Sequence, residues 1–426
     1  MQPKEQNNTG AVRAWGWIPS LYFTQGLPNA AAAGLSVVLY KNLGVSNTDI
    51  AFYTGCLYVP WVIKPLWSPL VELLGRKRLW IVATQLLMGV LLAMVALFLP
   101  GPAFFRTTLA LFWLVAFSSA THDIAADGFY LLALPQDLRA AFVGVRSTFF
   151  KLAMLAGQGG LVLLVGVWME SGQPVVQAWS KVFWLLSGWL GLVALLHFLV
   201  LPRPAGDGSA KHGRAFLAEW WTVFAAFFRK PGIVTALAFM LLYRFAEAQL
   251  AKLVQPFLLD ARAIGGLELT TKQLGLLYNT IGVAALLAGG LLGGWAVSRA
   301  GLKRLLWPMA LALNVPNLVY VYLAVVQPES LSTVGAAIAV EQFGYGFGFT
   351  AYMLYLMLFA EGEHKTAHYA ICTGFMALGM MVPGMWAGWV QDHVGYLAFF
   401  SWVCLATLPS FAVTALVKVD ALDGKR

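Results

Sequence analysis

Residues 68–78 read SPLVELLGRKR, and residues 294–304, which begin 226 positions further along the chain, read GWAVSRAGLKR. Each stretch closes a long apolar segment with a small residue, has a polar residue four positions later, and ends in a basic cluster that leads into the next apolar segment. One such loop would mean little, since many loops contain a few arginines. Two copies at equivalent places indicate an internal duplication. In a membrane protein, a duplication predicts a transporter with two helical bundles and one site between them.

The composition is that of a membrane protein. Of the 426 residues, 60% are hydrophobic and 11% are charged, whereas soluble domains contain roughly 25% charged residues. Apolar runs of about 18 or more residues recur along the whole length, which predicts an all-α polytopic membrane protein. The net charge of +9 is spread over alternate loops, so the expected partner is the lipid bilayer and not nucleic acid.

Neither a metal nor a cofactor is expected. Cys56, Cys372 and Cys404 lie in apolar segments without metal-ligand spacing, and they form no disulfide framework. No nucleotide-binding loop is present, so ATP is not the expected driver. The polar N-terminus leads directly into a full-length apolar segment, so we expect an uncleaved first helix.

Hydropathy predicts twelve transmembrane helices, separated by one long polar stretch that we interpret as a linker with an amphipathic, Trp-rich segment. The expected helices cover 15–40, 49–73, 79–100, 106–134, 140–169, 178–201, 232–260, 272–297, 303–326, 331–360, 366–390 and 395–418. The expected domains are therefore a six-helix bundle at 1–201, a cytoplasmic linker at 202–230 and a second six-helix bundle at 231–426.

The distribution of Lys and Arg predicts the orientation. With both termini in the cytoplasm, the cytoplasmic loops and tails hold about 18 of these residues and the opposite loops about five. The matching second and eighth helices are expected to begin at Thr48-Asp49 and Thr270-Thr271, whose side-chain oxygens can cap a helix start.

Charges inside a bilayer cost several kcal/mol, so each must face a partner or a wet cavity. Nine fall inside the expected helices: Lys64, Asp123, Asp127, Arg146, Lys151, Arg244, Glu247, Lys252 and Glu341. In the hairpin of the fourth and fifth helices, Asp127 is expected level with Arg146 and Asp123 level with Lys151, at depths of roughly 14 and 21 Å. Lys64 is expected between these layers.

In the second half, Arg244 and Glu247 are three positions apart and can pair locally, and Lys252 and Glu341 can meet across the cavity. The nine charges sum to about +1, which favours an anionic small-molecule substrate. Buried carboxyl groups also suit proton coupling.

From these positions we assign expected roles, although each side chain can instead hold helices together or gate one face. Substrate binding is expected of Lys64, Lys151, Gln25, Asn29, Arg244, Lys252, Tyr278, Asn279, Gln342 and Tyr345. Proton coupling is expected of Asp123, Asp127, Glu247 and Glu341, and gating or structural roles of Glu72, Arg76, Lys77, Arg78, Arg146 and Arg299. The glycines of residues 344–348 are expected to permit bending or close packing rather than to bind phosphate.

One pattern resembles that of an enzyme. His122 and Asp127 have the H-x-x-x-x-D spacing of some acyltransferases, in which an imidazole activates a hydroxyl. Here the pair lies inside a helix of a duplicated bundle, so we do not expect an enzyme and no residue is expected to be catalytic.

The two loops resemble the signature loops of the major facilitator superfamily, with Ser68 in place of the usual Gly, Glu72 in place of Asp, and Ser298 in place of the second acid. A narrower resemblance covers mainly the first half. Residues 64–70, KPLWSPL, and 120–128, ATHDIAADG, resemble segments of AmpG-type permeases.

Within those segments His122 stands where Gln is usual in the AmpG-type family, and Lys151 falls where a basic residue is found. The resemblance implies Lys64, Asp123, Asp127 and Lys151 as site residues. It also implies the peptide/acetyl-CoA transporter group, whose bacterial members carry anhydro-muropeptides into the cytoplasm with protons.

We therefore expect a monomeric, proton-coupled secondary transporter in the bacterial inner membrane that imports anhydro-muropeptides (GlcNAc-anhydroMurNAc peptides) by alternating access. Three alternatives stay open: the same fold with acetyl-CoA or a siderophore as substrate, a membrane-embedded acyl-transferring enzyme, and a non-transporting receptor.

Overall fold

The computed structural model describes residues 14–73, 76–204, 207, 213–362 and 364–419, and these form helices with no strand among them. Nine helices in this part of the chain are long and apolar enough to cross a membrane. They cover Lys77–Phe98, Phe104–Ala133, Thr148–Glu170, Val175–Val200, Ile233–Leu259, Thr271–Ala300, Leu302–Val326, Leu331–Ala360 and Ala367–Leu416. The all-α polytopic class is confirmed, while the number twelve stays a prediction.

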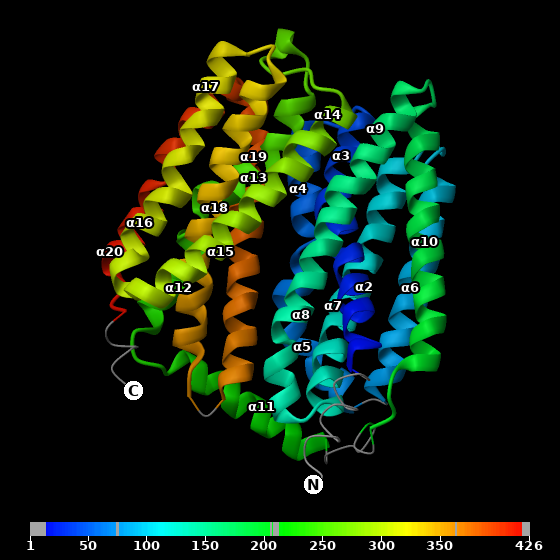
Figure 1. Cartoon of the computed structure of the whole chain (residues 1–426), viewed down its shortest axis with the longest axis vertical. Coiled ribbons are helices and arrows are strands. Elements are labelled where there is room, and N and C mark those ends of the chain that lie inside the picture. Colours follow the sequence, from blue (N-terminus) through cyan, green and yellow to red (C-terminus); the bar gives the residue numbers. More distant parts are fainter. Residues whose placement is uncertain (1–13, 74–75, 205–206, 208–212, 363, 420–426) are drawn as a thin grey trace. The chain divides into compact units, whose positions relative to one another are not determined.

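The elements of the first half match the expected helices within a few residues (Figure 1). They are α2 (Ile18–Ala30), the π-helical turn η1 (Ala31–Leu35), α3 (Ser36–Asn42), α4 (Asn47–Cys56), α5 (Val59–Leu73), α6 (Lys77–Phe98), α7 (Phe104–Ala133), α8 (Gln136–Met154), the π-helical turn η2 (Leu155–Leu161), α9 (Val162–Glu170) and α10 (Val175–Val200).

The remaining elements begin with α11, which lies in the expected linker. They are α11 (Gly213–Phe228), α12 (Ile233–Leu242), α13 (Phe245–Leu259), η3 (Arg262–Ile264), α14 (Thr271–Leu276), the π-helical turn η4 (Leu277–Gly282), α15 (Val283–Ala300), α16 (Leu302–Asn314), η5 (Val315–Asn317), α17 (Leu318–Val326), α18 (Leu331–Ala360), α19 (Lys365–Leu405) and α20 (Leu408–Leu416).

Several expected helices are interrupted, and local chemistry explains where. The second expected helix breaks between α4 and α5, because the ring of Pro60 clashes with the carbonyl of residue 56, at which α4 ends. The last two expected helices meet within α19 at a non-helical turn at Gly395, whose φ of 78° suits glycine, and the second of them continues as α20. The expected start at Thr48-Asp49 is two residues late, since Ser46 caps α4, whereas Thr270 caps α14 as expected.

Contacts divide the chain into two units. Unit 1 contains residues 1–36, 63–161 and 168–218, and unit 2 contains residues 37–62, 162–167 and 219–426. Residues 37–62 and 162–167 thus belong to unit 2 although they lie in the first half of the sequence. The expected domains, two six-helix bundles joined at 202–230, stay a prediction.

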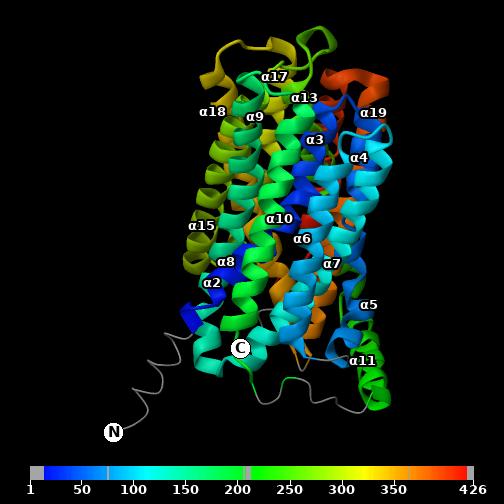
Figure 2. The same cartoon turned by 90° about the vertical axis from the view of Figure 1, so that its right-hand side faces the viewer.

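In unit 1, α6 packs along α7 and α10, and α2 packs on α8 and α7 (Figures 1 and 2). Trp17 and Phe129 meet edge to face in its core, with ring centroids 5.3 Å apart. A Cβ added at Gly26 would lie 2.6 Å from the Cβ of Ala153, so glycine is needed for α2 to approach α8 this closely.

In unit 2, α18 packs against α15 and α16, and α19 packs against α13 and α4. Glycines at 289 and 346 line the contact between α15 and α18: a Cβ at Gly289 would press on the Phe343 carbonyl oxygen, and one at Gly346 on that of Leu286. The expectation that residues 344–348 permit close packing is therefore confirmed. The rings of Phe239 and Tyr243, which both stack on Tyr352, fill the neighbouring core.

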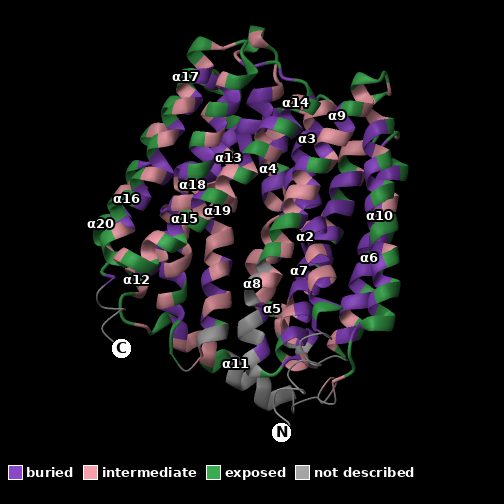
Figure 3. Cartoon of the chain, in the orientation of Figure 1, coloured by how far each residue is buried: buried purple, intermediate pink, exposed green. Residues whose placement is uncertain are grey.

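The outer face of the helices is apolar. On α6, Leu86, Leu87 and Val90 are 48%, 49% and 57% exposed, although their side chains are hydrophobic. Figure 3 shows exposed residues in green along α10, where Leu185 and Leu192 are 53% and 54% exposed. Exposing so many apolar side chains to water would be unfavourable, so this surface faces lipid.

The linker contributes one specific contact to unit 1. Asp207 accepts hydrogen bonds from the backbone N–H groups of Lys77 (2.7 Å) and Arg78 (3.2 Å), which are the first residues of α6. The carboxylate satisfies N–H groups that would otherwise lack partners and complements the positive end of the helix dipole. The Arg78 guanidinium donates to the carbonyls of Phe198 and Leu201, where α10 ends.

Candidate functional site

The first group of site residues lies in unit 1, where α2, α5 and α7 each supply one polar side chain. Gln25 Nε2 on α2 donates to Asp123 Oδ1 on α7 at 2.7 Å. Lys64 Nζ on α5 lies 4.0 Å from the other carboxylate oxygen, Oδ2. Asp123 is 9% exposed and Lys64 is half-buried, so a cation and an anion meet here largely out of solvent. Asn29 lies one turn after Gln25 on α2 and is half-buried.

One turn along α7, Asp127 forms the expected layer with Arg146 of α8. The Arg146 Nη2 to Asp127 Oδ1 distance is 2.5 Å. The guanidinium also lies over the rings of Tyr22 and Tyr130, 4.5 and 5.1 Å from their centroids, and Tyr22 Oη donates to Asp127 at 3.3 Å. Two aromatic faces and a carboxylate leave Arg146 little freedom, so this pair braces α2, α7 and α8.

The expected second layer is wrong in its partner. Lys151 is exposed at the last turn of α8 and makes no ion pair with Asp123, which instead faces Lys64 and Gln25. The expectation rested on depth along the hairpin alone. Depth does not specify which face of a helix a side chain occupies. Arg146 lies on the face of α8 that contacts α7, whereas Lys151 is exposed.

A second group lies in unit 2 around Glu341 of α18. Its Oε2 accepts hydrogen bonds from Tyr320 Oη of α17 (3.1 Å) and from Gln342 Nε2 (2.9 Å). Glu247 of α13 lies close enough to Glu341 for their charges to interact. Tyr278 of η4 interacts electrostatically with both carboxyl groups. Two acids and several phenols are therefore gathered in the interior of unit 2, where Glu247 and Glu341 are buried.

Arg244 stands beside these acids, but it does not form the expected ion pair with Glu247. Its guanidinium donates to Tyr345 Oη and lies over the ring of Phe349, 4.6 Å from the centroid. The residue precedes α13, at the break after α12, where helical hydrogen bonding is interrupted. That break turns the side chain away from Glu247, so the expected local pair, which assumes a continuous helix, is wrong.

Lys252 and Glu341 do not meet either. Lys252 Nζ donates to Thr54 Oγ1 of α4 at 3.1 Å and lies over the ring of Tyr58, 5.2 Å from its centroid. This places a buried cation between α13 and the segment of residues 37–62 within unit 2. Neither partner is charged, so the ammonium group is held by one hydrogen bond and an aromatic face.

Several polar atoms of the unit 2 group have no hydrogen-bond partner among the described residues. They are Arg244 Nε, Glu247 Oε2, Asn279 Nδ2 and Glu341 Oε1, in side chains at most 7% exposed. A buried donor or acceptor without a partner costs about 1–3 kcal/mol. Donors and acceptors left open side by side suit a ligand that offers both kinds of group.

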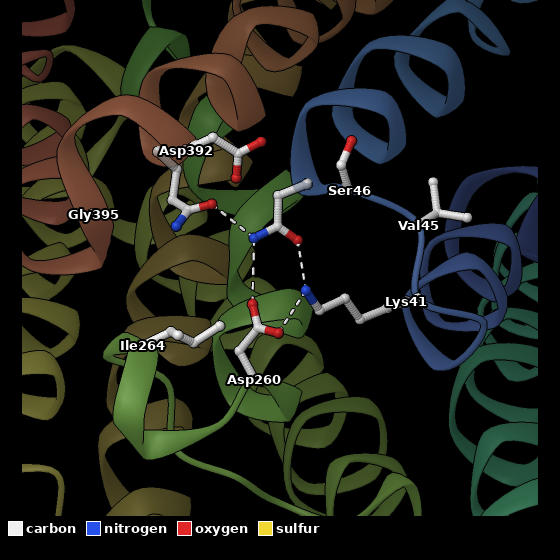
Figure 4. Close-up of a pocket in the computed structure, with 10 residues that line it drawn as sticks. Lys41, Val45, Ser46, Asp260, Ile264, Asp392 and Gly395 are labelled. Carbon is white, nitrogen blue, oxygen red and sulfur yellow. Dashed lines mark hydrogen bonds and ion pairs between the residues drawn. The ribbon is translucent and has the colours of Figure 1, made fainter.

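A polar network occupies one end of unit 2 and lines a pocket of about 530 Å³. Lys41 Nζ lies 2.6 Å from Asp260 Oδ1, and Asn47 Nδ2 donates to Asp260 Oδ2 (3.3 Å) and to Gln391 Oε1 (2.7 Å). Figure 4 shows the side chains of Lys41 and Asp260 pointing toward one another. Tyr396 Oη also donates to Asp260, at 2.5 Å.

This network was missed in the sequence because Lys41 and Asp260 lie at expected helix ends, where charges are ordinary. It ties the α3–α4 turn to α13 and α19. We call Lys41, Asn47, Asp260, Gln391 and Tyr396 the end network.

The remaining expected residues lie apart from both groups. Arg76 is exposed where α6 begins, and Arg299 is exposed on α15 with its guanidinium 4.6 Å from the ring centroid of Trp295. The side chain of Glu72 lies outside the described residues. No three His, Cys, Asp or Glu side chains gather as metal ligands in the described part of the chain.

Comparison with known proteins adds three findings. The family model of the Major Facilitator Superfamily matches residues 20–382. The anhydromuropeptide permease of Escherichia coli K12 is 27% identical over 416 residues, which cover 95% of this chain and 80% of the relative. The putative transporter AmpG 4 of Rickettsia conorii is 22% identical over 396 residues, which cover 88% and 91%.

Solved structures share the fold. A POT family transporter, crystallised with a thioalcohol-conjugated peptide, superposes with a TM-score of 0.70 over 97% of both chains at 11% identity. The nucleoside transporter NupG superposes with a TM-score of 0.67 over 96% of this chain and 98% of that one, at 14% identity.

Proposed function

Because the chain belongs to the major facilitator superfamily, and is therefore a multi-pass membrane transporter of a small molecule and not an enzyme, we propose that it carries anhydro-muropeptides into the cell. The E. coli relative, matched along 95% of this chain, is a permease of that substrate class. The proposed setting is the bacterial inner membrane, with both termini in the cytoplasm and a single chain as the working unit.

The observation that carries the proposal is the cluster of Lys64, Asp123 and Gln25. Two of these residues lie in the segments that resemble muropeptide permeases, and the cluster is assembled from three separate helices of unit 1. The ammonium group of Lys64 is 4.0 Å from the Asp123 carboxylate, which is long for an ion pair. A carboxylate of the substrate peptide can therefore bind Lys64 without first breaking a tight contact.

The unit 2 group, taken by itself, suits a sugar. The hydroxyl and acetamido groups of the sugar moiety donate and accept hydrogen bonds, and Arg244, Glu247, Asn279 and Glu341 leave both kinds of atom without partners. The rings of Tyr345 and Phe349, which already stack with Arg244, offer flat apolar faces to a sugar ring.

Proton coupling is assigned to the two acids of unit 2. Glu247 and Glu341 carry two negative charges when ionised, and Arg244 supplies one positive charge, so the group holds an excess charge of −1 in an apolar environment. A proton on one carboxyl removes that excess, which links proton binding to burial of the site. Asp127 is assigned to bracing instead, because Arg146 already neutralises it at 2.5 Å.

The test is uptake of labelled GlcNAc-anhydroMurNAc peptide into proteoliposomes with and without an inward proton gradient. We expect gradient-dependent uptake that falls about tenfold or more in Lys64→Ala and in Asp123→Asn, since each removes one charge-assisted contact. Lys181→Ala is the matched control, because Lys181 is exposed and bonds only to Gln173 and the face of Trp168.

Other results would replace the proposal. Uptake of labelled acetyl-CoA or of a ferric siderophore, with none of the muropeptide, would assign another anionic substrate to the same fold. Tight binding of the muropeptide without any uptake by folded protein would indicate a receptor.

A further inference from the structure

Four polar side chains of unit 1, three of them buried and the fourth half-buried, form a continuous chain of hydrogen bonds outside the proposed transport site. Ser20 Oγ on α2 lies 3.0 Å from His197 Nε2 on α10, and His197 Nδ1 lies 3.0 Å from Gln85 Oε1 on α6. Gln85 Nε2 in turn lies 3.0 Å from His122 Nε2 on α7. Gln85 and His122 are 0% exposed and His197 is 1% exposed.

In the orientation that the side-chain amide of Gln85 has in the structure, the roles of the ring nitrogens follow. Its NH₂ group only donates, so Nε2 of His122 accepts and the ring proton sits on Nδ1, which has no hydrogen-bond partner among the described residues. Its oxygen only accepts, so His197 donates from Nδ1, and its Nε2 accepts from the hydroxyl of Ser20, for which the carbonyl oxygen of Trp17, 3.1 Å from Oγ, is a competing acceptor. Both imidazoles are neutral in this arrangement. A second proton on His122 would set two donors against each other at Gln85.

The residue after His122 closes the chain into a ring. Asp123 accepts from Gln25 of α2 at 2.7 Å, so α7 is joined to α2 directly and also through α6 and α10. Successive residues of a helix point about 100° apart. His122 and Asp123 therefore hold α7 from two different sides, and together they oppose its rotation.

Apolar packing alone would restrain α7 weakly at this level. The buried residues around His122 and Asp123 are small: Ser118, Ser119, Ala120, Ala125 and Ala126. Small side chains let helices approach closely but present shallow ridges, so they resist rotation or sliding less than interlocking large side chains. The polar ring supplies the missing restraint at the depth where Asp123 must face Lys64.

We propose that Gln85, together with His122 and His197, is a positioning residue for substrate binding, holding α7 in the rotation that aims Asp123 at Gln25 and Lys64. The inference rests on the proposed function, in which Lys64, held beside Asp123, binds a carboxylate of the substrate. None of the three residues touches the substrate in this account. They act through the orientation of the carboxylate, because a small rotation of α7 carries Asp123 away from Lys64.

The first test measures KM and Vmax of muropeptide uptake for Gln85→Leu, which removes both imidazole partners at similar volume. We expect KM to rise about tenfold with Vmax little changed, since substrate affinity is lost while folded carriers still turn over. Gln85→Glu, which as the acid carries the same donor and acceptor, is expected to restore most of the affinity. Thr84→Val is the control, because Thr84 is equally buried on α6 but bonds only to the backbone of its own helix.

A fall in Vmax at unchanged KM, shared by Gln85→Leu and Thr84→Val, would indicate a folding defect and overturn the inference.

The second test needs no substrate. In a chain with Cys56, Cys372 and Cys404 replaced by Ala, the alkylation rate of Asp123→Cys by a small maleimide reports how α7 presents this position. We expect the rate to rise several-fold when Gln85→Leu is added and to stay constant with Thr84→Val. Equal rates in all three backgrounds would overturn the positioning role. A changed rate, together with no muropeptide uptake by the native chain, would reject the proposed function and retain the positioning role.

Discussion

At the scale of single residues, the role of each charged group inside the membrane depends on its partners and not on how many charges there are. Asp127 is neutralised by a tight contact with Arg146, whereas Asp123 shares a looser contact with Lys64 and a hydrogen bond from Gln25. The tight pair braces helices, and the loose one can exchange its partner for a substrate. The same contrast applies in unit 2, where Glu341 has donors from Tyr320 and Gln342 but no cation in contact.

Replacing Glu341 by Gln tests the assignment of the proton. An amide resembles the protonated carboxyl and cannot release a proton, so Glu341→Gln is expected to abolish gradient-driven accumulation and to keep exchange of labelled for unlabelled substrate across the membrane. Counterflow and gradient-driven uptake measured on one preparation separate the two. Glu329→Gln, at an exposed position between α17 and α18, is the control. Undiminished accumulation in Glu341→Gln would assign the coupled proton to Glu247 instead.

The histidine tautomers provide a second prediction at this scale. Because the amide of Gln85 donates to one ring and accepts from the other, His122 and His197 are both expected to carry the proton on Nδ1 with Nε2 bare. Nitrogen-15 NMR of histidine-labelled protein reports this directly, and His122→Gln and His197→Gln assign the two signals. The Nδ1-protonated signals are expected to disappear in Gln85→Leu. Rings protonated on Nε2 in the native chain would contradict the hydrogen-bond chain described above.

At the scale of elements, irregular turns and glycines decide which side chains reach the interior. The π-helical turns η1, η2 and η4 each insert one residue into a turn of helix, which shifts the faces of the helix on either side. Tyr278 and Asn279 lie within η4, and the break before α13 redirects Arg244. Glycines also permit the close contact between α15 and α18, and α18 is the helix that carries Glu341 and Tyr345.

Adjacent glycines of α15 offer a matched test of that contact. Gly289→Ala is expected to lower the stability of the protein by about 1–3 kcal/mol, because its Cβ would press on the Phe343 carbonyl oxygen of α18. Gly290→Ala places its Cβ at an ordinary 3.7 Å from the nearest atom of α18, and alanine favours the helix, so no loss is expected there. Thermal unfolding in detergent compares the two. Equal unfolding midpoints would mean that α15 and α18 can separate slightly at little cost in stability.

At the scale of the whole molecule, the grouping of segments departs from the order of the sequence. Residues 37–62 belong to the first expected bundle by position but to unit 2 by contact, and the end network holds them to α13 and α19. A Cβ at Gly388 of α19 would press on the Asn47 carbonyl oxygen, so the helices meet without a gap. In the alternating access that we propose for this chain, this contact opens and closes once per cycle.

Breaking one member of the end network tests its part in the cycle. Asp260→Ala leaves the ammonium group of Lys41 without its ion-pair partner, where both side chains are at most 14% exposed. Unpairing a buried charge costs about 3–5 kcal/mol, so the contact is expected to loosen. The alkylation rate of Ile50→Cys, at a fully buried position one turn along α4 from Asn47, is then expected to rise, and Lys41→Met combined with Asp260→Leu is expected to restore part of the protection. An unchanged rate in Asp260→Ala would mean that apolar packing alone closes this end.

The sequence by itself determined the membrane class, the duplicated loops, the ends of most helices to within a few residues, and the superfamily. Hydropathy, charge bias and motifs belong to each segment separately, so they can be read without knowing what packs against what. It also determined that charges such as Asp127 and Arg146 lie at matching depths, because helical rise depends only on residue number.

Only the tertiary structure decided which face of each helix a side chain occupies, and hence its partner. Lys64 and not Lys151 meets Asp123, Arg244 turns to Tyr345 and not to Glu247, and Lys252 meets Thr54 and Tyr58. The chain from Ser20 through Gln85 to His122 was missed because its members lie on four helices with no local pattern. The physical reason is that rotation about a helix axis is set by the packing of neighbouring helices, by π-helical turns and by breaks.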